Sequence, residues 1–588
     1  MNGLRRAVAV AVLVLLGLAG VAGTASAHAQ LEGSDPPADG VVATAPAAVA
    51  LLFGEPVDIA GGSVQAFDDH LARVDRDDLA AADGNRVRVG LRDGLRPGTY
   101  TVSWRVSSVD THPVSGTFTF SVGAPSIVTG VLPGTGGDGQ AEALLAVARG
   151  LSYAGLALGP GALLVLLVLW PAGTADRRAR RVVTTGVVTL LVSTLAGMLL
   201  QGVWASGLPL SALWSSPAAL DTHSRRFDQL FALRSYLVLG FGAVLAGAVL
   251  AASSPVPSPH PSRSAVPVVR RRRALIGAAA AVSAGLLCTW SLAGHPAAGE
   301  QPLIAVAADV AHIGAMAVWL GGLALLATTL ARSARAADLA LVVPRFSRLA
   351  LTCVAVLALT GTYQSWRDVG TLDALTGTTF GRLLLLKLAG VVVLVALGAV
   401  ARRWVQRHTA PARQLLAPRV LAAASGQPMP LEEPAAPPLP DRAAVRALRR
   451  GVVAELVVAA AVLGLTAVLV ATVPARQAWT PPVERSVTVG SVVVDLVVDV
   501  PRIGDTTVHL DVHRPDGTPV PVQQLTGSLT LPAARLGPLP VRVPPPAPDA
   551  QRPSAGLTFP AAGDWTLQLT VRTSALDAVA VTVTVPVT

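Results

Sequence analysis

The sequence predicts a multi-domain membrane protein with three parts: an extracytoplasmic β-sandwich, an eight-helix transmembrane bundle and a second extracytoplasmic β-sandwich. Eight long apolar segments occupy the middle of the 588-residue chain, arginines gather in alternate connections between them, and stretches of alternating polar and apolar residues lie on either side. Charged residues make up only 14% of the chain, against about 25% in soluble globular proteins. This composition argues against an ordinary cytosolic enzyme, and the high apolar content excludes intrinsic disorder.

Residues 1–27 have the pattern of a signal peptide. Two adjacent arginines precede an apolar stretch over residues 7–21, and an Ala-Ser-Ala cleavage site ends at Ala27. Cleavage there makes His28 the first residue of the mature chain. The alternative is an uncleaved anchor, for which the apolar stretch is short. With cleavage, the segment that follows lies outside the cytoplasmic membrane.

Residues 28–124 are expected to form the first β-sandwich. Short apolar or alternating stretches, such as 49–53, 99–106 and 116–122, are separated by Pro, Gly and Asp, which is typical of an all-β domain. The segment carries 13 acidic and 7 basic residues. An acidic outer domain attracts cations, although the same charge is also explained by solubility alone. The glycine-rich residues 125–141 are expected to form a flexible linker.

Residues 142–475 are expected to form the membrane domain, because they contain eight apolar segments long enough to cross a bilayer as helices. Arginines are concentrated after the first, third, fifth and seventh spans, so the positive-inside rule places the first domain and the C-terminus outside. The Pro-rich residues 404–450 are expected to form a disordered cytoplasmic loop. The predicted spans are 142–170, 182–206, 229–252, 273–294, 303–330, 346–366, 382–401 and 452–473.

Residues 483–588 are expected to form the second outer β-sandwich. A strand over 506–513 precedes a Pro-Asp-Gly turn, and further alternating stretches surround it. His509, Asp511 and His513 alternate along this strand, so they share one face. Two interpretations remain, a second metal-binding patch or an ordinary solvated strand face, and the second is favoured.

His28, Asp110 and His112 are the candidate metal ligands of the first domain. The α-amino group of an N-terminal histidine, with a pKa near ~8, can lose its proton to a metal and chelate it together with the imidazole. Asp110 and His112 are two residues apart, so they point to one face of a strand. Two imidazoles, an amine and a carboxylate suit a tetragonal copper(II) (Cu2+) centre. The alternative is a frayed terminus and a polar turn without metal.

Four stretches of the first domain carry a family resemblance: residues 28–31 (HAQL), 34–37 (SDPP), 52–57 (LFGEPV) and, most specifically, 103–116 (SWRVSSVDTHPVSG). With these stretches the segment resembles the CopC family of periplasmic copper-binding proteins.

The resemblance implies that His28, Asp110 and His112 are the copper(II) ligands. The family usually has Asp-Gly-His where this chain has Thr111 in the middle, which leaves both ligand positions intact.

The membrane domain carries a second set of matching stretches. They are residues 291–296 (SLAGHP), 308–312 (ADVAH), 318–323 (VWLGGL), 345–348 (RFSR), 360–361 (TG) and 381–387 (GRLLLLK). With these stretches the domain resembles CopD, the partner inner-membrane family. The two resemblances cover most of residues 28–475, so the chain looks like a CopC–CopD fusion, and copper handling at the cytoplasmic membrane is implied. The tail is similar to small β domains that end some such fusions.

Several polar or sulfur-containing side chains lie within the predicted spans, where ionisable groups are costly and usually line a pathway or an interface. Asp309, His312 and Met316 are spaced i, i+3, i+7 and share a helix face, and Cys288 and His295 are seven apart and also share one. Nitrogen and sulfur ligands suit copper, so the two faces together predict a copper entrance in the membrane. The alternative is hydrogen bonding between helices by Asp309 and His312, with Met316 and Cys288 as packing residues.

Two further ionisable residues lie inside the spans. Glu455, near the inner end of the eighth span, is interpreted as a proton or copper exit group or as the partner of a nearby arginine, and the second is favoured. Lys387, the only lysine in the chain, either pairs with an acid across the bundle or extends outward to the interface.

Three classes of function follow from these features. The favoured one is a copper homeostasis membrane protein that binds copper(II) outside and moves copper across the cytoplasmic membrane, with import implied by the resemblance. The alternative is a non-transporting protein that stores copper or delivers it to an outer-facing enzyme. An oxygen-activating enzyme ranks last, because the carboxylate fills a copper position that oxygen chemistry tends to need open, so we expect a protein that is not an enzyme.

The expected partners are the copper ion and the lipid bilayer, with a copper chaperone or a cuproenzyme as a third candidate. Nucleic acid is not expected despite the net charge of +10, because the arginines follow the pattern of membrane loops.

Overall fold

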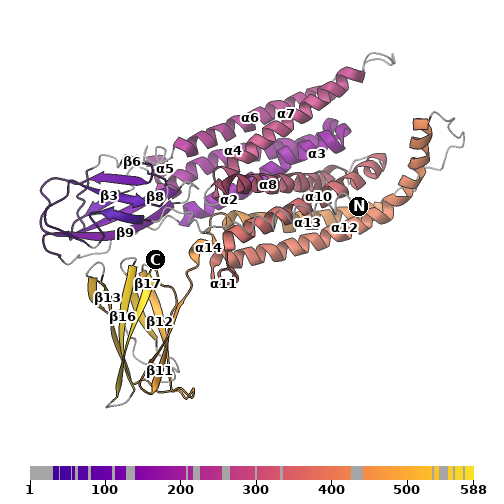
Figure 1. Cartoon of the computed structure of the whole chain (residues 1–588). Coiled ribbons are helices and arrows are strands. Elements are labelled where there is room, and N and C mark those ends of the chain that lie inside the picture. The colour runs from indigo at the N-terminus through magenta and orange to yellow at the C-terminus, as the bar shows by residue number, and fades with distance from the viewer. Residues whose placement is uncertain are drawn as a thin grey trace. The chain divides into compact units, whose positions relative to one another are not determined.

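A computed structural model describes most of the chain. The described residues are 31–38, 40–54, 56–59, 64–76, 81–108, 113–126, 139–206, 209–215, 225–253, 265–297, 301–330, 336–425, 442–502, 504–532, 536–541, 554–559, 563–573 and 577–587. The predicted signal peptide and the predicted ligands His28, Asp110 and His112 lie outside them. The chain contains two β-rich domains and a bundle of long helices (Figure 1).

The first domain contains two sheets that share one core, which confirms the predicted β-sandwich architecture. Strand order is β1-β3-β7-β6 in one sheet and β2-β9-β8-β4 in the other, where β5 also pairs with β8. Phe53 meets Trp104 edge to face at 5.2 Å between ring centroids, and both side chains are buried. The strands are β1 (Leu31–Asp35), β2 (Val41–Val42), β3 (Ala48–Phe53), β4 (Val57–Asp58), β5 (Val64–Phe67), β6 (Ala81–Asp83), β7 (Arg86–Gly90), β8 (Gly98–Ser108) and β9 (Pro113–Val122).

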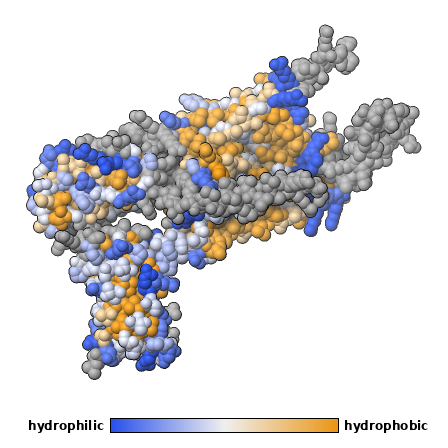
Figure 2. Space-filling view, viewed as in Figure 1, coloured by the Kyte–Doolittle hydropathy of each residue, from blue (hydrophilic) through white to orange (hydrophobic). Residues whose placement is uncertain are grey.

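The described part of the bundle contains eight helices that are long and apolar enough to span a membrane, as predicted. Figure 2 shows hydrophobic residues covering the visible face of the bundle. The spans are built from α2 (Gly139–Leu156) with α3 (Ala162–Leu169), α4 (Arg177–Ser206), α6 (Arg225–Ser253), α7 (Ala265–Ser291), α8 (Pro302–Leu325), α10 (Ala336–Val369), α12 (Thr379–Ser425) and α13 (Arg442–Leu469).

Three details of the bundle differ from the sequence-based expectations. The first span is interrupted by a π-helical turn, η1 (Ala157–Gly161), which contains Pro160. The fourth span ends at Ser291 rather than at residue 294. Helix α12 continues to Ser425, where a disordered loop was expected from residue 404, because alanine, leucine and arginine, all good helix formers, are frequent there.

Glycines allow the helices of the bundle to touch backbone to backbone around η1. A Cβ atom at Gly161 would overlap the carbonyl oxygen of Ala317 on α8, and one at Gly321 would overlap that of Ala157. A Cβ atom at Gly186 on α4 would overlap the backbone of η1 in the same way. These contacts hold η1 directly against α4 and α8.

The tail also contains two four-stranded sheets around one core, with Trp565 fully buried. Along β12, His509 and His513 are partly exposed while the valine and leucine residues between them are buried, as the predicted alternation requires. His509 Nε2 lies 3.0 Å from Asp499 Oδ2. The strands are β10 (Val483–Val489), β11 (Val492–Val498), β12 (Gly504–His513), β13 (Gln524–Leu531), β14 (Leu536–Pro540), β15 (Ser554–Phe559), β16 (Gly563–Arg572) and β17 (Ala578–Val587).

Candidate functional site

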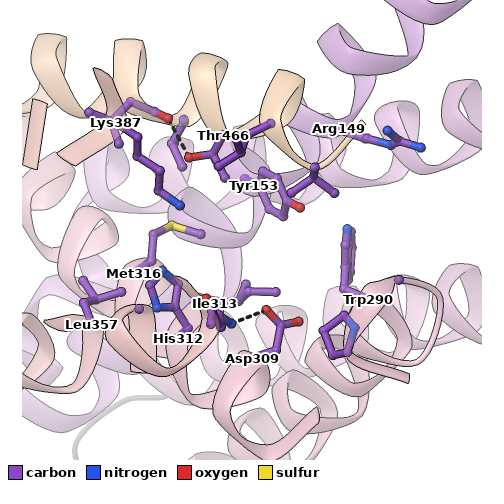
Figure 3. Close-up of a pocket in the computed structure, with 18 of the residues that line it drawn as sticks. Arg149, Tyr153, Trp290, Asp309, His312, Ile313, Met316, Leu357, Lys387 and Thr466 are labelled. Atoms are coloured by element: carbon purple, nitrogen blue, oxygen red, sulfur yellow. Dashed lines mark hydrogen bonds between the residues drawn. The ribbon is translucent and has the colours of Figure 1, made fainter. Parts of the chain in front are cut away.

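A cavity of about 680 Å³ lies inside the helical bundle (Figure 3). Its polar lining residues lie toward the end of the bundle at which the chain enters at Gly139 and leaves after Leu469. Tyr153 is the fourteenth residue after Gly139, and Met316 is the fourteenth after the start of α8 at Pro302. Along α8 the cavity extends to Leu320, so the contact between Gly161 and Ala317 lies beside it.

One face of α8 supplies the central residues of the cavity. Asp309, His312 and Met316 all line it, which confirms that the three share a face. The Asp309 carboxylate accepts hydrogen bonds from Ser291 Oγ at 2.6 Å and from Gln364 Nε2 at 2.9 Å. These donors are neutral, so the carboxylate keeps its charge available to a cation or to a positively charged side chain.

The hydrogen bonds of His312 assign the roles of its two ring nitrogens. Its Nδ1 lies 2.9 Å from Thr360 Oγ1, and that hydroxyl donates its own hydrogen to the Val356 carbonyl oxygen at 2.7 Å. Thr360 therefore accepts from Nδ1–H, because its only hydrogen is already in use. The arrangement leaves Nε2 with a lone pair, which is the form of histidine that binds a metal ion.

Lys387 extends from α12 into the cavity toward Met316 and His312 (Figure 3). Asp309 and Asp368 line the same cavity. Of the two interpretations made from the sequence, the structure supports a side chain directed into the bundle and not extension outward.

The sequence reasoning did not single out two arginines of the cavity, Arg234, which is buried, and Arg149, which is half-buried. Arg234 donates from Nε and Nη2 to Thr289, at 3.0 and 2.8 Å, and its guanidinium carbon lies 3.8 Å from the ring centroid of Trp290. Arg149 donates to Gln201 Oε1 at 3.3 Å. Both arginines fall inside predicted spans, so the rule that marked Asp309 as costly in a membrane would have marked them too.

The remaining predicted membrane residues are not brought into the cavity by the described contacts. Cys288 is half-buried on α7 and Glu455 is buried on α13, and neither is among the described lining residues. His295 lies beyond the end of α7, in the short helix η4 (His295–Ala297), and only its backbone is described. The predicted shared face of Cys288 and His295 required one continuous helix, so that spacing argument was wrong.

In the first domain, Asp110 and His112 belong to the connection between β8 and β9, and the described strands end on either side of them, at Ser108 and Pro113. Another group of candidate ligands, Asp68, Asp69 and His70, lies in an exposed turn after β5.

The Asp69 carboxylate is hydrogen-bonded in the fold. A hydrogen bond from Ser126, with a second from His70, holds the pKa of this carboxyl below its usual value. The turn is therefore explained by local hydrogen bonding.

The comparisons with known proteins agree with this architecture. Residues 31–123 match the family model of the CopC domain, and residues 340–469 match that of copper resistance protein D, CopD. The first match spans β1–β9, and the second spans α10–α13, which contribute Gln364, Arg367 and Lys387 to the cavity. The α8 face with Asp309 and His312 precedes the second match.

Three relatives are similar to this chain. Copper transport protein CutJ of Bacillus subtilis (strain 168) is 28% identical over 400 residues, which cover 66% of this chain and 70% of that protein. Protein YobA of Escherichia coli (strain K12) is 38% identical over 98 residues, 16% of this chain and 79% of YobA. Copper resistance protein C of Escherichia coli is 37% identical over 111 residues, 18% of this chain and 87% of that protein. The chain therefore belongs to the CopC family and joins its CopC domain to a CopD membrane region in a single polypeptide.

Proposed function

We propose that this protein binds copper(II) outside the cytoplasmic membrane and moves copper inward through the bundle. The observation that carries the proposal is the α8 face, where Asp309, His312 and Met316 line one cavity. A carboxylate, an imidazole nitrogen with a lone pair and a thioether form a ligand set that suits copper in either oxidation state. The presence of CopC and CopD regions in one chain, and the similarity to a copper transport protein, support copper as the cargo.

We place the capture of copper(II) at His28, Asp110 and His112 in the CopC domain. In this proposal the signal peptide is removed after Ala27, both β domains lie outside, and the membrane is the inner one. The free α-amino group then chelates copper together with the imidazole of His28. The CopC domain thus concentrates copper at the side of the membrane on which the cavity residues lie.

The capture site is tested by titrating the purified full-length protein with copper(II). Two forms of the protein are compared, one that begins with a free His28 and one that carries an additional residue before His28. We expect tight binding by the first and at least tenfold weaker binding by the second, because the extra residue converts the amine into an amide. The substitution His28→Ala should weaken binding to a similar extent while the thermal stability stays unchanged. Equal affinity in all three proteins would contradict this ligand assignment.

The membrane step is tested by copper uptake into cells that produce the full-length chain. His312→Ala should abolish uptake, because it removes the nitrogen ligand from the cavity. His408→Ala is the matched control, since His408 lies on α12 outside the described lining and its ring stacks on Trp404. Uptake that stays equal in the two variants at equal membrane levels would exclude His312 from the copper path.

A second function, delivery of copper to an outer-facing enzyme without transport, is favoured by one observation. Backbone contacts hold η1 directly against α4 and α8 beside the cavity, which suits a bundle that holds copper and does not pass it on. Under this alternative, deletion of the chain lowers the copper content of an extracytoplasmic enzyme while copper inside the cell stays unchanged. Measuring both pools in the same cells separates the two functions.

A further inference from the structure

The cavity carries more positive than negative charge. Among its described lining residues, four side chains are basic and two are acidic, and the neutral form assigned to His312 adds no charge. Excess positive charge inside an apolar bundle is costly unless an anion lies close to it. The basic residues are Arg149, Arg234, Arg367 and Lys387, and the acidic residues are Asp309 and Asp368.

Two of the basic residues are matched in number by the two acids. Lys387 and Arg367 line the cavity together with Asp309 and Asp368. Arg149 and Arg234 remain, and both line the same cavity. No ion pair joins either of these two arginines to a carboxylate of the described residues.

Arg149 has unused hydrogen-bonding capacity. Its Nη2 makes one long hydrogen bond to Gln201, and its Nη1 is buried and has no partner among the described residues. On its own helix the nearby acid is Glu142, which lies seven positions earlier and is exposed. A buried guanidinium N–H without an acceptor costs free energy, so the cavity is incomplete at this point.

Arg234 is held rigidly beside the same region. Its hydrogen bonds to Thr289 and its stacking on Trp290 fix the guanidinium plane. Tyr153 is buried and lines the cavity, and its hydroxyl adds a neutral donor. Figure 3 shows Arg149 and Trp290 on the side of the cavity away from Lys387, with Tyr153 between Lys387 and Arg149.

We propose that Arg149, Tyr153 and Arg234 form a binding site for a small oxyanion of the carboxylate class. Guanidinium groups bind carboxylates by charge-assisted, often bidentate, hydrogen bonds, and a site fixed before binding loses little entropy. The cavity volume of about 680 Å³ falls in the range of ordinary small-molecule sites. The site goes beyond the proposed copper function and binds its anion in the absence of copper.

The site has a consequence for the cargo if the proposed function also holds. A bare copper ion that enters the cavity meets a net positive charge, whereas an ion that brings a carboxylate ligand neutralises the two arginines. Anion binding then raises copper affinity, and by linkage copper raises anion affinity by the same factor.

The test is a titration of citrate into the full-length protein in phosphatidylcholine nanodiscs without copper. We expect saturable binding, at least tenfold weaker in Arg149→Gln and unchanged in Arg450→Gln, an exposed arginine at the start of α13. Tyr153→Phe removes a single donor and should weaken binding by a smaller factor. If Arg149→Gln fails to fold, Arg149→Lys keeps the charge but loses the bidentate geometry, and it should also bind more weakly.

Two outcomes would overturn the proposal. One is citrate binding that is absent from the wild-type chain or equal in the wild type, Arg149→Gln and Tyr153→Phe. The other concerns bound lipid, which is measured by native mass spectrometry of the protein from nanodiscs that contain phosphatidylglycerol. If the wild type retains this lipid, Arg149→Gln loses it and citrate never binds, then the arginines hold a lipid phosphate and not a soluble oxyanion. Failure of copper uptake with intact citrate binding would count against the proposed function alone.

Discussion

The contact between η1 and α8 makes a prediction in which two similar substitutions have opposite effects on stability. Gly161 has helical backbone angles, φ −61° and ψ −49°, so alanine fits its backbone. Its Cβ would nevertheless overlap the Ala317 carbonyl oxygen. Carbon atoms in ordinary contact stay about 3.5 Å or more apart, so α8 would have to move by roughly 1 Å. Overpacking of this kind costs about 1–3 kcal/mol.

Gly150 is the matched control on the preceding helix, α2. A Cβ atom there would meet only the Ala467 Cβ atom at 3.7 Å, which is an ordinary contact. Alanine also has a higher helix propensity than glycine, by up to about 1 kcal/mol. Gly161→Ala should therefore lower the thermal unfolding temperature of the detergent-solubilised protein, and Gly150→Ala should raise it or leave it unchanged. If both variants unfolded at the temperature of the wild type, η1 and α8 would not be in backbone contact.

Three further predictions concern other parts of the chain. Thr360→Val removes the acceptor of His312 Nδ1–H, so copper uptake should fall roughly 10- to 100-fold at unchanged membrane levels of the protein. Full uptake would show that Thr360 does not orient the His312 ring. Gly116→Ala places a Cβ atom 2.6 Å from the Trp104 ring, so the CopC domain should lose about 1–3 kcal/mol by denaturant titration, and no change would refute the contact. The fold lowers the pKa of Asp69, so the ionised carboxylate stabilises the folded domain. This contribution is complete above about pH 4 and is lost as the pH falls through the pKa of Asp69 in the folded state. Between pH 7 and about pH 3 the unfolding temperature of Asp69→Asn should therefore fall less than that of the wild type. Identical falls in the two proteins would contradict this prediction.

The sequence predicted the spans and the α8 face because both depend on local patterns. Hydropathy over about twenty residues identifies a span, and the i, i+3, i+7 spacing of Asp309, His312 and Met316 fixes a shared helix face whatever surrounds it. The end of α7 carried a local signal that was missed, since Gly294 and Pro296 disfavour continuation of a helix toward His295.

The two arginines were hidden for a different physical reason. A window of mean hydropathy tolerates one charged residue, so Arg149 and Arg234 did not interrupt their predicted spans. What makes Arg234 acceptable is the carbonyl oxygen of Thr289, which lies 55 residues away in the sequence. Only the tertiary fold brings that carbonyl to the guanidinium. The same holds for the Thr360 hydroxyl that assigns the tautomer of His312.

The single lysine of the chain gives the bundle a built-in chemical reporter. Lys387 is half-buried and lines the cavity, and the only other amine of the polypeptide is its α-amino group. A small amine-reactive reagent that does not cross membranes can therefore acylate one side chain only, and only while the cavity is open to the side on which the reagent is added. The extent of modification, read as a mass increase on one peptide, measures the fraction of molecules in that state without any engineered cysteine or fluorophore.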